Sequence, residues 1–360
     1  MISKRVIITS GGTGGHIFPA IILGKKLTKE GSEVLFLGDK RLSGYIKGEK
    51  VLPFVYVSSG TSLREIKSLW NIVFGVLKSL YTIFKFKPDV IVGFGCYATL
   101  PILLAGVILR KKIFIHEQNS HIGKVNKFFS SRAKYIFTSF YEMYGIDIKD
   151  TPKIEFTGNL VRDEIKQLYN LTYEYPSENE KFNILITSGS GGASFFAERF
   201  INIFKYFPDD LKNKICVIQQ VKLKSEIDIV KAFYEKHSIE YETKEFFVDM
   251  PQKIKSAHLV VARSGVGTMS ELAIAGKPTI FIPSPTVADN HQFFNADFYR
   301  KNGACILLEE KCFDEKNFSK IMVDLIQNSK QLKDLSKNIR SFACLDAEDK
   351  IYNFIMEDFS

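Results

Sequence analysis

The chain has few of the features that mark metal-binding, disulfide-bonded or membrane-spanning proteins. Its five cysteines are odd in number and widely spread, and none lies in a C-x-x-C pair or beside a histidine. Zinc sites and disulfide frameworks are therefore not expected, and reduced thiols favour an intracellular protein. The N-terminus lacks the basic start and long apolar segment of a signal peptide. Apolar runs such as 98–109 are shorter than the roughly 20 residues that span a bilayer. We expect a protein that is made and kept inside the cell.

Length and composition are those of an ordinary globular protein of about two domains. The chain has 360 residues, of which 45% are hydrophobic and 25% charged, and this excludes wholesale disorder. The formal charge of +9 suggests an anionic partner such as a nucleotide, a nucleic acid or an acidic membrane surface. A nucleic acid is not expected, because the chain lacks a recognisable binding module with aromatic stacking residues.

Short apolar segments alternate with helical patterns through the first half of the chain. Most are continuously apolar rather than alternating, as expected for parallel strands buried on both faces. The pattern predicts an α/β fold with a doubly wound sheet, whose ligands lie beyond the carboxyl ends of the strands. The expected strands are 5–9, 33–37, 54–57, 90–93, 113–116, 135–138 and 154–157.

The second half repeats this plan after a polar stretch, 170–181, which we interpret as a surface linker or loop. The simplest architecture is two Rossmann-like, doubly wound domains that face each other across a cleft. The tail beyond Asn317 is predicted to be helical, with its last helix near 347–359. The expected strands of this half are 182–187, 215–219, 259–262, 279–282 and 304–308.

A glycine-dense turn that contains a histidine follows the first expected strand. Its four glycines, within 11–15, allow positive φ and close approach to a ligand. Pro19 suits the first turn of the helix that follows, whose free amides favour an anion. The spacing is neither that of a dinucleotide-binding GxGxxG nor that of a P-loop. Such a turn also fits a tight strand-to-helix connection, but His16, which exchanges a proton near neutral pH, favours a site.

Three more polar clusters follow expected strands of the second half. The turn 188–192, SGSGG, presents amides and small hydroxyls that suit a phosphate. In 262–276, Thr268 is expected to begin a helix with Glu271 in its first turn. There a carboxylate is either a helix-capping acid or an acceptor for ribose hydroxyls. The third cluster, DNHQ at 289–292, has the donors and acceptors that sugar hydroxyls require, and a solvated helix start has the same pattern.

Polar residues also follow two strands of the first half. His116, Glu117, Gln118 and Asn119 come directly after an apolar strand. Burying such groups unpaired is costly, so we expect them to line the cleft. Arg162 follows the last strand of this half and is a candidate ligand for an anion.

The segment 66–84 is predicted to be a helix that is apolar nearly all round, with flanking lysines that include Lys78 and Lys85. One interpretation is a core helix packed on the sheet. The alternative is a helix with one side packed inward and the other, ringed with basic residues, in contact with an anionic membrane surface.

Taken together, seven motifs resemble, in order and essentially end to end, the MurG family of bacterial cell-wall glycosyltransferases. The resemblance implies the two-domain GT-B fold, with domains at 1–160 and 161–342 and a C-terminal helix, about 343–360, that packs back on the first. The motifs are GGTGGHIFP at 11–19, GFGCY at 93–97, HEQN at 116–119, GNLVR at 158–162, SGSGGA at 188–193, RSGVGTMSELAIAGKP at 263–278 and DNHQ at 289–292.

The resemblance implies an inverting transfer of N-acetylglucosamine (GlcNAc) from UDP-GlcNAc to the muramyl C4 hydroxyl of the lipid carrier lipid I, giving lipid II for peptidoglycan. We expect His16 to be the general base, with Glu117 as the second candidate. Among the donor contacts, Glu271 is expected on ribose, the Phe247 backbone on uracil, and Asn119 and Gln292 on the sugar. The remaining expected donor contacts are Thr13, Gly14, Gly15, Arg162, Ser190, Val266, Gly267, Thr268, Met269 and Ser270.

The same resemblance sets the expected partners. They are UDP-GlcNAc, lipid I and an anionic membrane surface, with cell-wall synthesis proteins as further candidates. We expect a peripheral enzyme on the cytoplasmic face of the inner membrane. No cofactor or metal is expected, because the site motifs lack an acidic DxD pair. The alternatives are another GT-B enzyme that uses a UDP-sugar, such as an epimerase or a different glycosyltransferase, and a non-catalytic nucleotide-binding module at the membrane.

Overall fold

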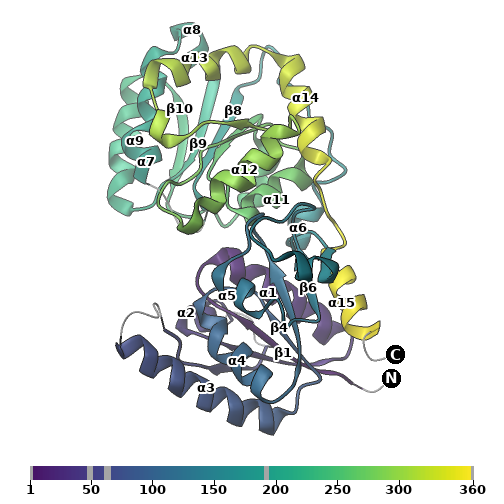
Figure 1. The fold of residues 1–360 in the computed structure, drawn as a ribbon. Helices are drawn as coiled ribbons and strands as arrows, with labels where there is room; N and C mark the ends of the chain where they lie inside the picture. Colours follow the sequence, from purple (N-terminus) through teal and green to yellow (C-terminus); the bar gives the residue numbers. More distant parts are fainter. Residues whose placement is uncertain (1–2, 47–51, 61–65, 190–193, 358–360) are drawn as a thin grey trace. The chain divides into compact units, whose positions relative to one another are not determined.

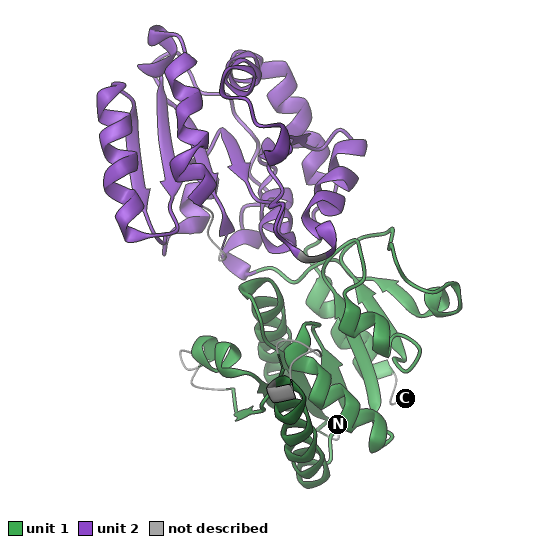
Figure 2. Ribbon diagram, turned by 60° about the vertical axis from the view of Figure 1, so that its left-hand side comes forward, with its two compact units in different colours: residues 1–161, 344–360 green, residues 162–343 purple. Residues whose placement is uncertain are grey.

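The computed structural model describes residues 3–46, 52–60, 66–189 and 194–357. The chain divides into two compact units (Figures 1 and 2). Unit 1 comprises Met1–Val161 and Cys344–Ser360, and unit 2 comprises Arg162–Ala343. The chain therefore leaves unit 1 once and returns to it for the C-terminal segment.

Unit 1 is built on a seven-stranded parallel sheet in the order β3-β2-β1-β4-β5-β6-β7. The order reverses between β1 and β4, as in a doubly wound fold. The strands are β1 (Arg5–Ser10), β2 (Glu33–Gly38), β3 (Phe54–Tyr56), β4 (Val90–Gly93), β5 (Lys112–Glu117), β6 (Tyr135–Thr138) and β7 (Ile154–Phe156). The helices are α1 (Gly14–Lys29), α2 (Lys40–Ile46), α3 (Ile66–Phe86), α4 (Leu100–Ile108), α5 (Lys124–Phe129) and α15 (Ala347–Glu357).

Helices cover both faces of this sheet, which explains the continuous apolar strands (Figure 1). In β1, Val6 and Ile8 belong to a core cluster with residues of α1 and α15. The intervening Ile7 belongs to another cluster, with residues of α3, α4 and α5. Alternate side chains of one strand thus enter two different apolar layers.

Unit 2 repeats the plan with a six-stranded parallel sheet, β10-β9-β8-β11-β12-β13, whose order reverses between β8 and β11. The strands are β8 (Phe182–Thr187), β9 (Ile215–Gln220), β10 (Glu240–Lys244), β11 (Leu259–Ala262), β12 (Thr279–Phe281) and β13 (Ile306–Leu307). The helices are α6 (Asp163–Lys166), α7 (Ser194–Glu198), α8 (Asp209–Lys212), α9 (Lys224–Lys236), α10 (Met250–Ser256), α11 (Val266–Ala275), α12 (His291–Lys301), α13 (Glu315–Ile326) and α14 (Ser329–Arg340).

Two features of unit 2 correct or complete the expectations. The sequence pattern missed β10, because this edge strand reads Glu-Tyr-Glu-Thr-Lys and has no apolar run. The polar stretch 170–181 is a loop of unit 2 rather than a linker between units. The hydroxyl groups of Tyr173 and Tyr175 hold it there, since they donate to the carbonyls of His258 and Ile326.

The start of α1 also differs from the expectation. The helix begins at Gly14, so Gly14, Gly15 and His16 form its first turn, and Pro19 lies inside the helix beyond that turn. The expected placement of Pro19 in the first turn is therefore wrong. Because proline has no backbone N–H, residue 19 cannot donate to the Gly15 carbonyl, and one bond of the second turn is missing. Among the glycines of this segment only Gly12 has a positive φ, 75°.

Helix α3 buries a narrow face and exposes the apolar stripe that the sequence contains. Ile72, Ser79 and Ile83 are buried, whereas Trp70 and Phe84 are 60% and 72% exposed. By length and composition this is the one helix of the described residues that could cross a membrane. Its exposed apolar side chains, here called the α3 apolar face, are Leu69, Trp70, Val73, Phe74, Leu77, Tyr81 and Phe84.

The C-terminal helix α15 packs within unit 1. Ala347, Ile351 and Ile355 are buried in the cluster that also contains residues of α1. The Lys26 ammonium lies 2.7 Å from the Asp349 carboxylate, which raises the pKa of Lys26 above its ordinary value. A short apolar stripe and an ion pair with Lys26 of α1 therefore attach the C-terminal helix to unit 1.

Candidate active site

Several candidate site residues of each unit lie at the carboxyl end of its sheet, close to the point where strand order reverses. In unit 1 the loop after β1 leads to His16, and the loop after β4 contains Phe94. In unit 2 the two strands that flank the reversal are β8 and β11. The second glycine turn follows β8, and α11 begins after β11. Adjacent loops diverge at such a point and leave a crevice there, which is where doubly wound proteins bind their ligands.

In unit 1, His16 is held between two glycine turns. A Cβ atom on Gly95 would lie 3.6 Å from the imidazole Nδ1, and one on Gly12 would lie 3.9 Å from its Cδ2. Both glycines have positive φ, 77° and 75°. The glycines therefore allow the backbone to approach the ring from two sides.

The hydrogen bonds of His16 define which ring nitrogen carries the proton. Nδ1 lies 2.8 Å from the Phe94 carbonyl oxygen and 2.9 Å from the Gln118 Oε1 atom. A carbonyl oxygen only accepts, so Nδ1 must be the donor. In the neutral ring the lone pair is then on Nε2, which is the form required of a base.

Glu117 is buried and accepts four N–H groups. Its Oε1 accepts from the backbone N–H and the Nδ2 of Asn119, at 3.0 and 3.2 Å. Its Oε2 accepts from Gly123 N at 2.9 Å and Asn126 Nδ2 at 2.8 Å. The carboxylate thereby organises the loop that contains Asn119.

The expectation that all four residues of the HEQN motif line a cleft is wrong for three of them. His116, Glu117 and Gln118 are buried inside unit 1, and only Asn119 is partly exposed. The His116 ring stacks on Phe94, and its burial lowers its pKa to about 4. His116 is therefore neutral at physiological pH. The sequence could not separate these inward and outward positions, because β5 continues to Glu117 in a sheet covered on both faces.

In unit 2, Glu271 and Arg162 form an ion pair. The Arg162 Nη2 and Nε atoms donate to Glu271 Oε1 at 2.8 and 3.2 Å. Burial raises the pKa of Glu271, and the positive charge of Arg162 opposes this shift. The helix α11 begins at Val266, so Glu271 lies in its second turn rather than in the first as expected.

The second glycine turn lies beside the start of α11. Gly189 has a φ of 67°, and a Cβ atom there would lie 3.3 Å from the Thr268 hydroxyl oxygen. The structure therefore brings Gly189, just after β8, to the first turn of α11, where the backbone amides of Gly267 and Thr268 have no partner within the helix and are of the kind that bind anions. Ser190, expected near the diphosphate, lies outside the described residues.

Gln292 connects the start of α12 to two neighbouring loops. Its Oε1 accepts from the Ser284 N–H, and its backbone carbonyl accepts from the Ser264 hydroxyl, both at 2.8 Å. Asp289 and Asn290, just before it, have φ values of 54° and 49°. Such left-handed backbone is unusual for residues other than glycine and concentrates at functional sites.

Sequence reasoning missed a polar network that supports the expected uracil contact. Thr187 donates to Gln220 Oε1 at 2.7 Å, and Gln220 Nε2 donates to the Glu245 carbonyl at 3.0 Å. Thr187 and Gln220 are the last residues of β8 and β9, and Glu245 follows β10, so the network connects three adjacent strand ends. Phe247, in the loop after β10, is buried with the ammonium groups of Lys244 and Lys253 over its ring. The polar pair Gln219-Gln220 at the end of an apolar strand is the signal that was available.

Models of the N-terminal and C-terminal domains of glycosyltransferase family 28 match residues 6–138 and 183–351. The chain belongs to glycosyltransferase family 28. It is accordingly an enzyme of the glycosyltransferase class, and each of its two units contains most of one family domain.

Two relatives show the extent of this family likeness. Both are named UDP-N-acetylglucosamine–N-acetylmuramyl-(pentapeptide) pyrophosphoryl-undecaprenol N-acetylglucosamine transferase. One, from Wolbachia pipientis subsp. Culex pipiens, is 36% identical over 99% of this chain and 99% of its own length. The other, from Rickettsia canadensis, is 39% identical over 93% of this chain and 94% of its own.

A crystal structure of MurG from Acinetobacter baumannii has the same fold. It matches with a TM-score of 0.81 at 24% identity, covering 98% of this chain and 99% of that chain. The doubly wound, two-domain GT-B architecture expected from the sequence is therefore confirmed.

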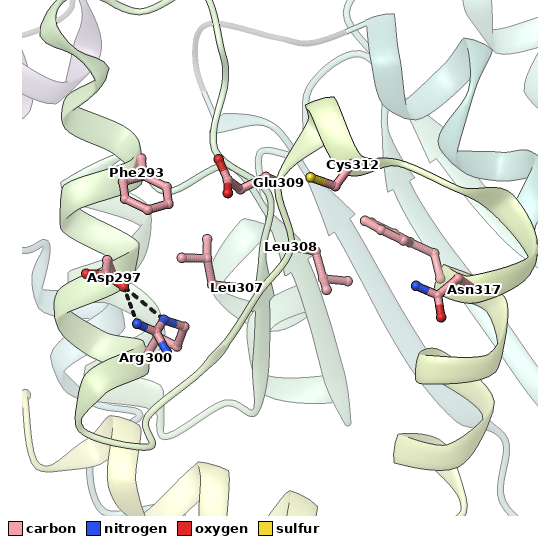
Figure 3. A pocket seen from close by; sticks show the side chains of 9 residues that line it. Phe293, Asp297, Arg300, Leu307, Leu308, Glu309, Cys312 and Asn317 are labelled. Carbon is pink, nitrogen blue, oxygen red and sulfur yellow. Dashed lines mark hydrogen bonds and ion pairs between the residues drawn. The ribbon is translucent and has the colours of Figure 1, made fainter.

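A separate pocket of about 410 Å³ lies in unit 2 of this family 28 enzyme (Figure 3). The Asp297 carboxylate in its wall is paired with Arg300 at 2.6 Å. None of the residues predicted to contact the donor lines it, so we assign the pocket no part in the transfer. Its lining residues are Phe293, Asp297, Arg300, Leu307, Leu308, Glu309, Cys312, Asn317 and Phe318.

Proposed function

We propose that this enzyme transfers GlcNAc from UDP-GlcNAc to the muramyl C4 hydroxyl of undecaprenyl-pyrophosphoryl-MurNAc-pentapeptide. The observation that carries the proposal is the likeness to transferases of that name along nearly the whole chain, at 36–39% identity. It spans both units, so it includes the residues that follow the strands of both sheets.

We place the nucleotide at the carboxyl end of the unit 2 sheet. Glu271 is suited to accept the ribose hydroxyls, and the start of α11 and Arg162 to hold the negative charge of the diphosphate. The Phe247 side chain is buried, which leaves its backbone to contact uracil. Gln292 and Asn119 are assigned to the sugar. The remaining donor contacts are assigned to Thr13, Gly14, Gly15, Ser190, Val266, Gly267, Thr268, Met269 and Ser270.

We assign the general base to His16 in preference to Glu117. The acceptor hydroxyl oxygen attacks the anomeric carbon while the bond from that carbon to the UDP oxygen breaks, with inversion. The hydroxyl proton passes to His16 Nε2, and the electron pair of the broken bond leaves on UDP. Glu117 is less suited to this step, because four N–H groups already occupy its carboxylate. Its role is to position Asn119.

We also propose that the α3 apolar face binds the membrane that contains the acceptor, as a peripheral contact. Seven large apolar side chains are exposed along one helix, which is more than isolated surface residues explain. Lys78 and Lys85 are exposed on the same helix, and basic residues beside an apolar face favour an anionic lipid surface. This placement suits an enzyme whose acceptor has a lipid anchor.

The test is product analysis with UDP-GlcNAc and a lipid I analogue in the presence of anionic vesicles. We expect equimolar UDP and a disaccharide product. Conversion of UDP-GlcNAc to an epimer without acceptor would indicate an epimerase instead. UDP binding without any turnover would indicate a nucleotide-binding module.

A further inference from the structure

Gln118 forms a closed triangle with His16 and Phe94. The Gln118 Oε1 atom lies 2.9 Å from His16 Nδ1, and the Gln118 Nε2 atom donates to the Phe94 carbonyl at 3.3 Å. That carbonyl also accepts from His16 Nδ1 at 2.8 Å. Gln118 is buried, on the segment that leaves β5.

The chemistry of the three groups fixes their orientation. The Phe94 oxygen only accepts, so the amide nitrogen of Gln118 must face it, and the amide oxygen must face the histidine. The N–H at His16 Nδ1 then has two acceptors at once. Both acceptors therefore stabilise the His16 tautomer with the proton on Nδ1, and together they fix the orientation of the imidazole ring.

We infer that Gln118 is a positioning residue for the base, acting as a neutral orienter of His16. This inference rests on the proposed role of His16. Gln118 holds the Nδ1–H tautomer and directs the Nε2 lone pair outward, as a carboxylate does in many hydrolases. Unlike a carboxylate, it adds no negative charge, so the imidazolium formed during transfer is not stabilised by a fixed anion. The proton accepted on Nε2 is therefore easily released in the next step.

The decisive variant is Gln118→Glu, which places a carboxylate beside Nδ1. An opposite charge at this distance raises a histidine pKa by about 1–3 units. We expect the His16 titration, followed by NMR in the donor-free protein, to move up by at least one pH unit. The acidic limb of the kcat/KM profile should move with it. His16→Gln identifies the His16 signal by its loss.

The other titratable groups around the ring are the same in both proteins. Among the described residues they include His116 on β5, Cys96 in the loop after β4, and Glu117 beyond Asn126. Among the described residues, none of these three hydrogen-bonds to the His16 imidazole. A shift between the two proteins therefore reports the substitution itself.

A second variant, Gln118→Met, keeps the volume and removes both polar contacts. We expect kcat to fall about 10–100-fold, which corresponds to one hydrogen bond to a group that becomes charged. The donor KM should stay within twofold. An unchanged His16 titration in Gln118→Glu would overturn the inference, and so would an unchanged kcat in Gln118→Met. Full turnover in His16→Ala would instead refute the assignment of His16 as the base. The NMR titration of Gln118→Glu would still test the contact between Gln118 and His16.

Discussion

The carboxyl ends of the two sheets have the same topology and different chemistry. In unit 1, the residues beside the strand reversal include a network of uncharged polar groups around a histidine and a buried carboxylate that accepts N–H groups of the following loop. In unit 2, the equivalent position has an ion pair between Arg162 and Glu271 beside the start of a helix. The first arrangement suits proton transfer and the second suits an anionic nucleotide. Under the proposed function, a few side chains after the strands distinguish the unit that takes the proton from the unit that binds the nucleotide.

The largest effect is expected from His16→Ala. Loss of a general base reduces kcat about 10²–10⁴-fold, while UDP affinity, measured by calorimetry, should change little because the nucleotide is assigned to unit 2. His237→Ala removes a histidine at the end of α9 and is the matched control, with wild-type turnover expected. Equal losses of turnover and UDP binding in His16→Ala would make His16 a donor contact and remove the contrast between the units.

Glu271→Ala should lower donor affinity and leave kcat nearly unchanged, the reverse of His16→Ala. A hydrogen bond that involves a charged group contributes about 1.5–3 kcal/mol, so donor affinity should fall about 10–100-fold. At saturating donor, kcat should be nearly normal. Arg162→Ala and the double variant complete a cycle, whose coupling energy measures the ion pair. A donor KM equal to that of the wild type would exclude Glu271 from the ribose.

Gly95 and Gly31 have similar φ values but different surroundings, so alanine variants of the two distinguish backbone strain from an effect on the site. Gly95 and Gly31 have φ values of 77° and 87°, so alanine at either position costs about 1–2 kcal/mol of stability. Gly31 has open space around it, whereas a Cβ on Gly95 would lie 3.2 Å from Asn126 Nδ2 and 3.6 Å from His16. We expect both variants to lose unfolding free energy, Gly95→Ala the more because Asn126 must move, and a lower kcat only in Gly95→Ala. Equal kcat values would show that the His16 ring tolerates a neighbouring methyl group.

The smallest effect concerns the membrane. Each basic residue near an anionic surface contributes about 1 kcal/mol, so Lys78→Glu and Lys85→Glu should each reduce vesicle partitioning at least about fivefold. Lys320→Glu changes an exposed lysine on α13 of unit 2 and should leave partitioning unchanged. Unaltered partitioning in the α3 variants would restrict membrane binding to other surfaces.

Local patterns predicted the strands well where the physical signal is local, and the site segments stay predictions. Buried parallel strands must be apolar on both faces, and glycine turns must follow strands that lead directly into helices. The same rules failed at β10, because a polar edge strand has no such signature. They also misplaced the start of α1 by treating Pro19 as a first-turn residue.

The stripe on α3 shows a different limit. The sequence contains a helical stripe of large apolar residues, and periodicity alone assigns such a stripe to the core or to a surface contact equally well. The structure buries Ile72 and Ile83, which lie largely off that stripe, and exposes Trp70 and Phe84, which lie on it. Packing on α4 and the sheet decided which face was covered.

The amino-acid sequence by itself determined the two doubly wound units, the family, and the segments that we propose for the site. These follow from periodicity and from motifs of adjacent residues. Only the tertiary structure decided that the Glu117 carboxylate accepts four N–H groups, that Gln118 lies within hydrogen-bond distance of His16, and that Arg162 pairs with Glu271 across 109 residues. Such roles depend on which groups are buried together, and chain folding rather than sequence distance sets that proximity.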